Sequence, residues 1–207
     1  FWGLRAQAAR SLGTMQDNDA LGILLAALAD TTGIADHRVR RAAVEALGQY
    51  RDERVVPTLL RFARQDPTYG VEAAASAALG NQQPTDEIIA VLTANCAKSS
   101  HRDRIRGSSV EALSRLDDPR GIGPAMELAA YGAPFRSRST GIEALGRLGR
   151  LKDQTERVRR FLEPLLKDRH ERAVWSAIRA LAELGDEKAV PVPVSYTHLT
   201  LPTNREG

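Results

Sequence analysis

The hydrophobic positions of this chain follow a repeating pattern. A run of small and apolar residues recurs and closes on Ala-Leu-Gly or a close variant, as in the segments 39–48 and 71–80. The leucines that close successive runs, called anchor leucines below, are separated by 35, 32, 34, 32 and 36 residues. They are Leu12, Leu47, Leu79, Leu113, Leu145 and Leu181. Six copies at a nearly constant spacing predict a repeat protein.

Each run has the spacing of an amphipathic helix. Val39, Ala43, Ala46 and Leu47 stand at positions i, i+4, i+7 and i+8, which share one helix face. Small residues such as those at 42–43 and 73–75 favour the close approach of a neighbouring helix. In four copies a glycine follows the anchor leucine, where a left-handed helix cap favours glycine. We therefore expect C-caps at Gly13, Gly48, Gly80 and Gly146.

A second set of segments, with longer aliphatic runs, lies between these helices. They cover residues 21–28, 55–62, 88–92, 122–128 and 158–166. Acidic residues and prolines, typical of a first helical turn, mark the starts at Asp52, Pro84 and Asp118. No strand pattern intervenes. The sequence thus predicts an all-α fold, an α-solenoid of about six stacked antiparallel helix pairs over residues 1–192.

The repeat resembles a known family. The phrase Val-Arg-Arg-Ala-Ala-Val-Glu-Ala-Leu-Gly at 39–48 is similar to HEAT repeats of the short bacterial kind, also called phycobilisome-lyase-like repeats. Residues 52–60 resemble the other helix of that family. The resemblance covers residues 1 to about 193 and implies a superhelical scaffold that binds a protein or peptide. The Trp, Tyr and Phe positions of tetratricopeptide repeats are not met.

A narrower resemblance concerns three short phrases. Residues 1–5, 66–74 and 131–134 look like the C-terminal HEAT-like region of bacterial zinc aminopeptidases of the aminopeptidase N family. That family carries its zinc-binding His-Glu-x-x-His motif upstream of this region, and none of those ligands is present here. The resemblance implies an accessory module beside a peptidase. An upstream His-Glu-x-x-His would favour this alternative, and further repeats would favour a scaffold.

The composition of the chain gives little information on the class of molecule that it binds. The 207 residues carry a formal net charge of +3, which does not by itself indicate a nucleic-acid-binding protein. Four of the 29 basic residues are lysines, so arginine dominates. The single cysteine, Cys96, excludes an internal disulfide and lies in an apolar helical stretch, where we expect a buried thiol.

Arginines cluster at similar places in several repeats. Stacking of the repeats would align them into a basic ridge that suits an acidic partner. Its candidate residues are Arg38, Arg40, Arg41, Arg104, Arg106, Arg136 and Arg138. Nearby acids favour mutual neutralisation instead, and they are Asp36, Glu45, Asp103, Glu111, Glu143, Glu156 and Glu163. Few aromatic residues stand near the arginines for base stacking, so we expect a protein or peptide partner and not a nucleic acid.

Motifs for catalysis or metal binding are incomplete. His170-Glu171 begins like a zinc-peptidase motif but lacks a second histidine four residues on. Residues 123–127 only superficially match an exopeptidase motif, and no phosphate-binding glycine loop occurs. His37, His101 and His170 each precede a repeat helix at differing offsets, which indicates solvated loops. We expect Trp2 and Trp175 to take part in core or terminal packing. No catalytic, cofactor-binding or metal-binding residue is predicted.

The repeat pattern stops near residue 193. The string from Pro193 to Thr203 looks like the conceptual translation of a transposase-based sequencing adapter. We therefore expect residues 193–207 to be a non-native tail and the array to be an excerpt of a longer one. The predicted function is that of a non-catalytic HEAT-repeat scaffold for a protein or peptide, and the alternative is the aminopeptidase accessory module.

Overall fold

The fold is described here from a computed structural model. The structure describes residues 1–29 and 36–185, apart from the side chains of Phe135 and Arg136. These residues form α-helices and short 3₁₀-helices and contain no strand, which confirms the predicted all-α solenoid. None of the helices in these ranges is long and apolar enough to cross a bilayer. The predicted tail, residues 193–207, lies outside the described residues.

The helices alternate between two layers. The anchor leucines lie on one layer, which comprises α1 (Trp2–Met15), α3 (His37–Leu47), α5 (Tyr69–Leu79), α7 (Arg104–Arg115), α9 (Phe135–Leu148) and α11 (Glu171–Glu183). The longer aliphatic segments form the other layer, which comprises α2 (Asn18–Ala29), α4 (Val56–Arg64), α6 (Asp86–Asn95), α8 (Ile122–Ala129) and α10 (Thr155–Leu162). Each predicted segment is therefore helical, and successive helices are paired as predicted.

Short 3₁₀-helices extend several of these helices. They are η1 (Glu53–Val55), η2 (His101–Asp103), η3 (Pro119–Gly121) and η4 (Glu163–Lys167). Capping side chains lie at or next to the predicted starts: Asp52, Thr85 (after Pro84) and Asp118 each accept a hydrogen bond from a backbone N–H two or three residues on. Such bonds satisfy donors that have no partner inside the helix.

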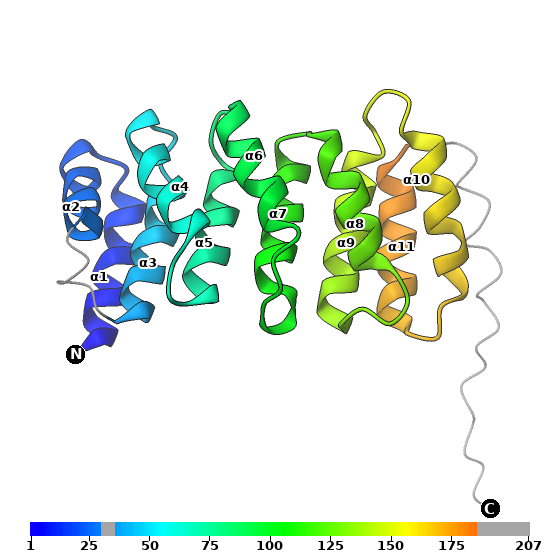
Figure 1. Ribbon diagram of the computed structural model, residues 1–207, viewed down its shortest axis with the longest axis horizontal. Coiled ribbons are helices and arrows are strands. Elements are labelled where there is room, and N and C mark those ends of the chain that lie inside the picture. The colour runs from blue at the N-terminus through cyan, green and yellow to red at the C-terminus, as the bar shows by residue number, and fades with distance from the viewer. Residues whose placement is uncertain (30–35, 186–207) are drawn as a thin grey trace, which may run out of the picture.

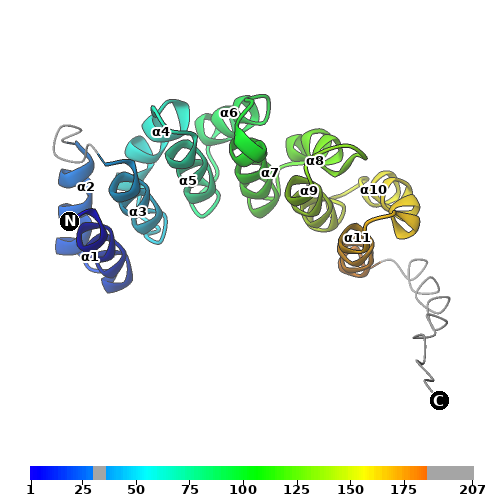
Figure 2. The same cartoon turned by 90° about the horizontal axis from the view of Figure 1, so that it is seen from below.

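The pairs stack side by side from the N-terminal to the C-terminal end (Figure 1). Figure 2 shows that the stack curves, so that the odd-numbered helices line the concave side and the even-numbered helices line the convex side. Each odd-numbered helix packs on the next one along the stack. The concave surface is therefore a continuous layer of six parallel helices.

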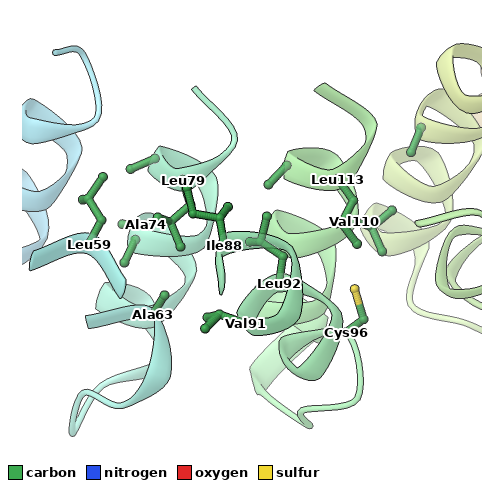
Figure 3. Packing of buried hydrophobic residues seen from close by; sticks show 14 of the residues in the cluster. Leu59, Ala63, Ala74, Leu79, Ile88, Val91, Leu92, Cys96, Val110 and Leu113 are labelled. Atoms are coloured by element: carbon green, nitrogen blue, oxygen red, sulfur yellow. The ribbon is translucent and has the colours of Figure 1, made fainter. Parts of the chain in front are cut away.

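The core runs between the two layers without interruption. Leu47, Leu79, Leu113 and Leu145 are fully buried, and Figure 3 shows Leu79 and Leu113 among the side chains packed between neighbouring helices. Full burial of a leucine contributes about 1.5–3 kcal/mol. No helix pair buries this face alone, so the stacking of repeats supplies the stability of each.

The glycines after the anchor leucines have a different role from the one predicted. Gly48 and Gly80 have φ of −64° and −67°, in the right-handed region, and Gly13 and Gly146 lie inside helices α1 and α9. The left-handed cap prediction was therefore wrong. We call the helices of the concave layer inner helices and those of the convex layer outer helices. A Cβ at Gly48 would lie 2.5 Å from the Cβ of Ala78 on α5, the next inner helix. Glycine is needed at this position because two helices approach closely there.

Candidate functional site

The concave face carries a groove centred on α5. The groove encloses about 260 Å³ and lies where α3, α5 and α7 stand side by side. Its floor is the inner surface of α5, formed by Gly70, Ala73, Ala74, Ala77 and Ala78. Its rim includes Arg41 and Glu45 of α3 and Arg104, Ser108 and Arg115 of α7. We call this feature the α5 groove.

The groove exists because α5 lacks long side chains where the preceding inner helix has them. The positions nine, six and two residues before the anchor leucine are Arg38, Arg41 and Glu45 in α3. In α5 the same three positions are Gly70, Ala73 and Ala77. A Cβ at Gly70 would meet no atom within 4 Å, so packing does not require glycine there. The missing side chains thus open the concave surface over one repeat.

The rim of the groove is basic. Arg41 pairs with Glu45 at 2.7 Å. The guanidinium of Arg115 donates to the backbone oxygen of Ala77 at 3.0 Å and to the Oδ1 of Asn81 at 2.7 Å, and Glu111 lies 3.9 Å from it. These contacts hold both side chains in place at the edges of the groove.

The third rim arginine is Arg104, the first residue of α7. Its side chain is exposed, and no carboxylate among the described residues pairs with it. The neighbouring Asp103 faces away, because its carboxylate accepts a hydrogen bond from Ser137 and lies 3.9 Å from Arg106. Arg104 therefore brings an uncompensated positive charge to the groove.

Two arginines of the predicted ridge are buried between repeats. Arg40 pairs with Asp66, with side chains 11% and 2% exposed, and Arg138 pairs with Asp168, with side chains 4% and 6% exposed. Each arginine stands seven residues before an anchor leucine. Its partner aspartate lies in the loop just after the next outer helix, between α4 and α5 for Asp66 and between η4 and α11 for Asp168. These two arginines therefore form buried ion pairs between an inner helix and a neighbouring loop, and they are not part of an exposed basic ridge.

The other ridge candidates differ in their surroundings. Arg38 pairs with Asp36, and its guanidinium carbon lies 4.1 Å from the centre of the Trp2 ring. Arg106 donates to the backbone oxygen of Cys96 and to the carboxylate of Glu127. The side chain of Arg136 lies outside the described part. Of the six candidates whose side chains are described, only Arg41 and Arg104 line the α5 groove.

Neutralisation of charge is extensive, as the sequence indicated. All seven acids that stand near the arginines form ion pairs with arginine within 4.0 Å. Surface pairs of this kind contribute at most about 1 kcal/mol each. These pairs also lower the positive potential that the arginines would otherwise present at the surface.

The histidines and tryptophans singled out in the sequence do not form a common site. His37, His101 and His170 are exposed at the beginnings of inner helices or just before them. Within the described ranges no group of three His, Cys, Asp or Glu side chains is placed to hold a metal ion. We expected core or terminal packing for Trp2 and Trp175; they are 48% and 64% exposed, so neither lies in the core, and Trp2 stacks with Arg38 at the N-terminal end of the array.

Cys96 is buried at the end of α6, as predicted, and appears among the packed side chains in Figure 3. Burial raises the pKa of its thiol to about 12. Because the thiolate is the reactive form, this cysteine is chemically inert in the folded chain.

A second hollow, of about 400 Å³, lies between α1, α2 and α3. Its lining is almost entirely apolar and includes Leu12, Ile23 and Val39. The segment that joins α2 to α3, residues 30–35, lies outside the described residues, so the described part does not define how far this hollow is open. The α5 groove is bounded by described residues on all sides.

The described chain is thus an α-solenoid whose concave face carries a groove with a floor of alanine and glycine and a rim of polar side chains. Residues 1–80 match the family model for HEAT repeats, and residues 173–192 match the model for the PBS lyase HEAT-like repeat. No curated protein sequence matches the chain. The resemblance to the C-terminal region of zinc aminopeptidases is not addressed by these matches and stays a prediction.

Solved structures share the architecture at low sequence identity. A designed armadillo repeat protein is 17% identical, with a TM-score of 0.53 over 86% of this chain and 92% of its own. An engineered protein is 18% identical, with a TM-score of 0.54 over 89% of this chain and 92% of its own. Human deoxyhypusine hydroxylase aligns with a TM-score of 0.44 at 19% identity, over 89% of this chain and 80% of its own. The first two similarities support the repeat fold and nothing more specific.

Proposed function

We propose that this chain is a non-catalytic scaffold that binds a segment of a partner protein in the α5 groove. The observation that carries the proposal is the hollow itself, which lies on the concave face over a helix that has Gly70, Ala73 and Ala77 where α3 has long side chains. Concave surfaces of stacked repeats are the extended binding surfaces of such proteins.

The size of the groove favours a polypeptide over a small molecule. Pockets for cofactors and drug-sized ligands enclose about 300–1,000 Å³ and are lined mostly by hydrophobic and aromatic side chains. The α5 groove encloses about 260 Å³, and its lining consists of alanine, glycine and polar residues. Such a space accepts one or two side chains of a segment that continues along the concave surface on either side.

The floor of the groove suits the close approach of another backbone. Alanine adds only a methyl group and glycine no side chain, so a bound segment can approach α5 closely at Gly70 and Ala77, the two floor residues that are not buried. The polar rim groups, among them the half-buried Ser108 and the Arg41–Glu45 pair, can form hydrogen bonds to that segment at its edges. The surface therefore offers both contact area and polar groups that determine orientation.

The test is a peptide selection on the folded chain and on a variant whose groove is filled. The filled variant carries Gly70→Gln and Ala77→Gln, which place long neutral side chains where α3 accommodates Arg38 and Glu45. The matched control carries Gly22→Gln and Ala94→Gln, at exposed positions of the outer helices α2 and α6. A phage-displayed library of random twelve-residue peptides is panned on each immobilised protein.

We expect peptides that bind the parent and the control variant but not the filled variant. Circular dichroism and urea unfolding establish that all three proteins are folded. The proposal is overturned if no peptide is enriched on the parent. It is also overturned if the selected peptides bind the filled variant as tightly as the parent.

A further inference from the structure

We infer that the segment bound in the α5 groove is acidic, and that one of its carboxylates pairs with the guanidinium of Arg104. This inference rests on the proposed function and specifies the chemistry of the partner. The guanidinium of Arg104 reaches the rim of the groove with no carboxylate partner among the described residues, whereas Arg41 is already paired with Glu45.

The balance of charge around the groove supports an anionic occupant. Three arginines and one glutamate line it. The side chain of Arg115 is held by Asn81 and by the backbone oxygen of Ala77, both neutral, and its nearest carboxylate is 3.9 Å away on Glu111. Positive charge therefore remains on the α7 side of the groove, and a carboxylate placed there gains a charge-assisted hydrogen bond.

The position of Arg104 favours an extended segment. Arg104 lies on α7, at one side of the bare surface of α5, and Arg41 and Glu45 lie on α3 at the other side. Packed helices stand about 8–10 Å apart, so the two sides are roughly 20 Å apart. An extended chain rises about 3.3 Å per residue. A segment of about six residues thus spans the groove, with its acidic residue over α7 and small residues over α5.

A protein segment fits these features better than a nucleic acid. A nucleic acid carries a negative charge at every nucleotide and would meet Glu45 across the groove as well as Arg104. The lining contains no aromatic side chain on which a base could stack. A peptide with one or two carboxylates places its charge at Arg104 and leaves the α3 side free for neutral groups.

The selection described above also tests this inference. Peptides recovered on the parent are expected to be enriched in Asp and Glu relative to the starting library, and the enrichment is expected to disappear on Arg104→Gln. The matched control is Arg157→Gln, which removes another exposed arginine, from the outer helix α10.

One selected peptide is then titrated by fluorescence anisotropy. Arg104→Gln is expected to weaken its binding about fivefold, the effect of losing about 1 kcal/mol at an exposed ion pair, while Arg157→Gln leaves binding unchanged. Binding to the parent is expected to weaken as sodium chloride is raised, because salt screens exposed charges.

The outcomes separate the inference from the proposed function. Peptides that are lost on the filled variant but are not acidic, or that do not depend on Arg104, overturn the inference and leave the function standing. A ten-nucleotide oligothymidylate that binds more tightly than the selected peptide, and is weakened by Arg104→Gln, also overturns it. Failure to recover any peptide overturns both.

Discussion

The guanidinium of Arg40 on α3 donates two hydrogen bonds to the carboxylate of Asp66, at 3.0 and 3.1 Å, across the boundary between two repeats. Arg138 and Asp168 form the same contact three boundaries further along, and Lys98 pairs with Glu72 between them. The backbone oxygens and amides at the ends of the outer helices take part in these clusters. Polar groups thus join the repeats at one edge of an otherwise apolar core.

Removal of one partner from the buried pair should destabilise the array strongly. Arg40→Ala leaves the carboxylate of Asp66 buried without its cation, a change that typically costs about 3–5 kcal/mol. Arg41→Ala, at the next residue of the same helix, breaks only the exposed pair with Glu45 and should cost less than about 1 kcal/mol. Urea unfolding followed by circular dichroism measures both. Equal losses for the two variants would contradict the structural role of Arg40.

Stability should fall in acid because of the same carboxylate. Burial tends to raise the pKa of Asp66, but hydrogen bonds from Arg40 and Thr68 outweigh burial and hold that pKa below 3.8. Because the pKa is lower in the folded state, the contribution of Asp66 is fully present above about pH 4 and is lost as the pH falls through the folded-state value.

The variant Asp66→Asn isolates this effect. It should be less stable than the parent at pH 7 and should lose less further stability between about pH 4 and pH 2. Urea midpoints at a series of pH values measure the difference. Parallel acid profiles for the two proteins would show that Asp66 is not a source of the pH dependence.

Close helix packing should make one glycine irreplaceable and leave another free to change. Gly48→Ala places a methyl group 2.5 Å from the Cβ of Ala78, so α3 and α5 must move apart, at a typical cost of about 1–3 kcal/mol. Gly22→Ala, inside α2, meets no atom within 4 Å and should stabilise the chain by about 0.5–1 kcal/mol. Thermal unfolding of the two variants gives opposite shifts if packing decides the outcome.

The thiol of Cys96 should report on unfolding. Because burial raises its pKa to about 12, it should react with a thiol reagent such as DTNB at pH 8 only when α6 opens or the chain unfolds. The reaction rate in increasing urea is expected to follow the unfolding transition. Rapid reaction in the absence of urea would show that the thiol is accessible in the folded state.

The fold could be predicted from the sequence because one residue, the anchor leucine, recurs at nearly equal intervals and is buried in five of its six copies, Leu12 being partly buried. Which polar residues are buried could not be predicted from the sequence, because burial depends on contacts between repeats. Arg40 and Arg41 are adjacent and chemically identical, yet Asp66, 26 residues away, draws only one of them into the interior. In the sequence, Gly48 after Leu47 has the pattern of a helix cap. Its close approach to Ala78 of α5 is visible only in the folded structure.

The α5 groove had a signal in the sequence that the helix pattern alone did not reveal. Gly70, Ala73 and Ala77 are ordinary small residues when α5 is considered by itself. Their meaning emerges when repeats are aligned on the anchor leucines, because α3 has Arg38, Arg41 and Glu45 at the same positions. The free charge of Arg104 could not be predicted, because it depends on Asp103 turning toward Ser137.

The central claim, that the concave groove over α5 holds a partner segment, is tested most directly by NMR of alanine methyl groups. A selected peptide is added to protein labelled with ¹³C at alanine methyls. We predict that the resonances of Ala73 and Ala77, on the floor of the groove, shift on binding. Ala90 and Ala94, exposed on the outer helix α6, should not shift. Shifts at Ala90 and Ala94 with Ala73 and Ala77 unchanged would contradict the account.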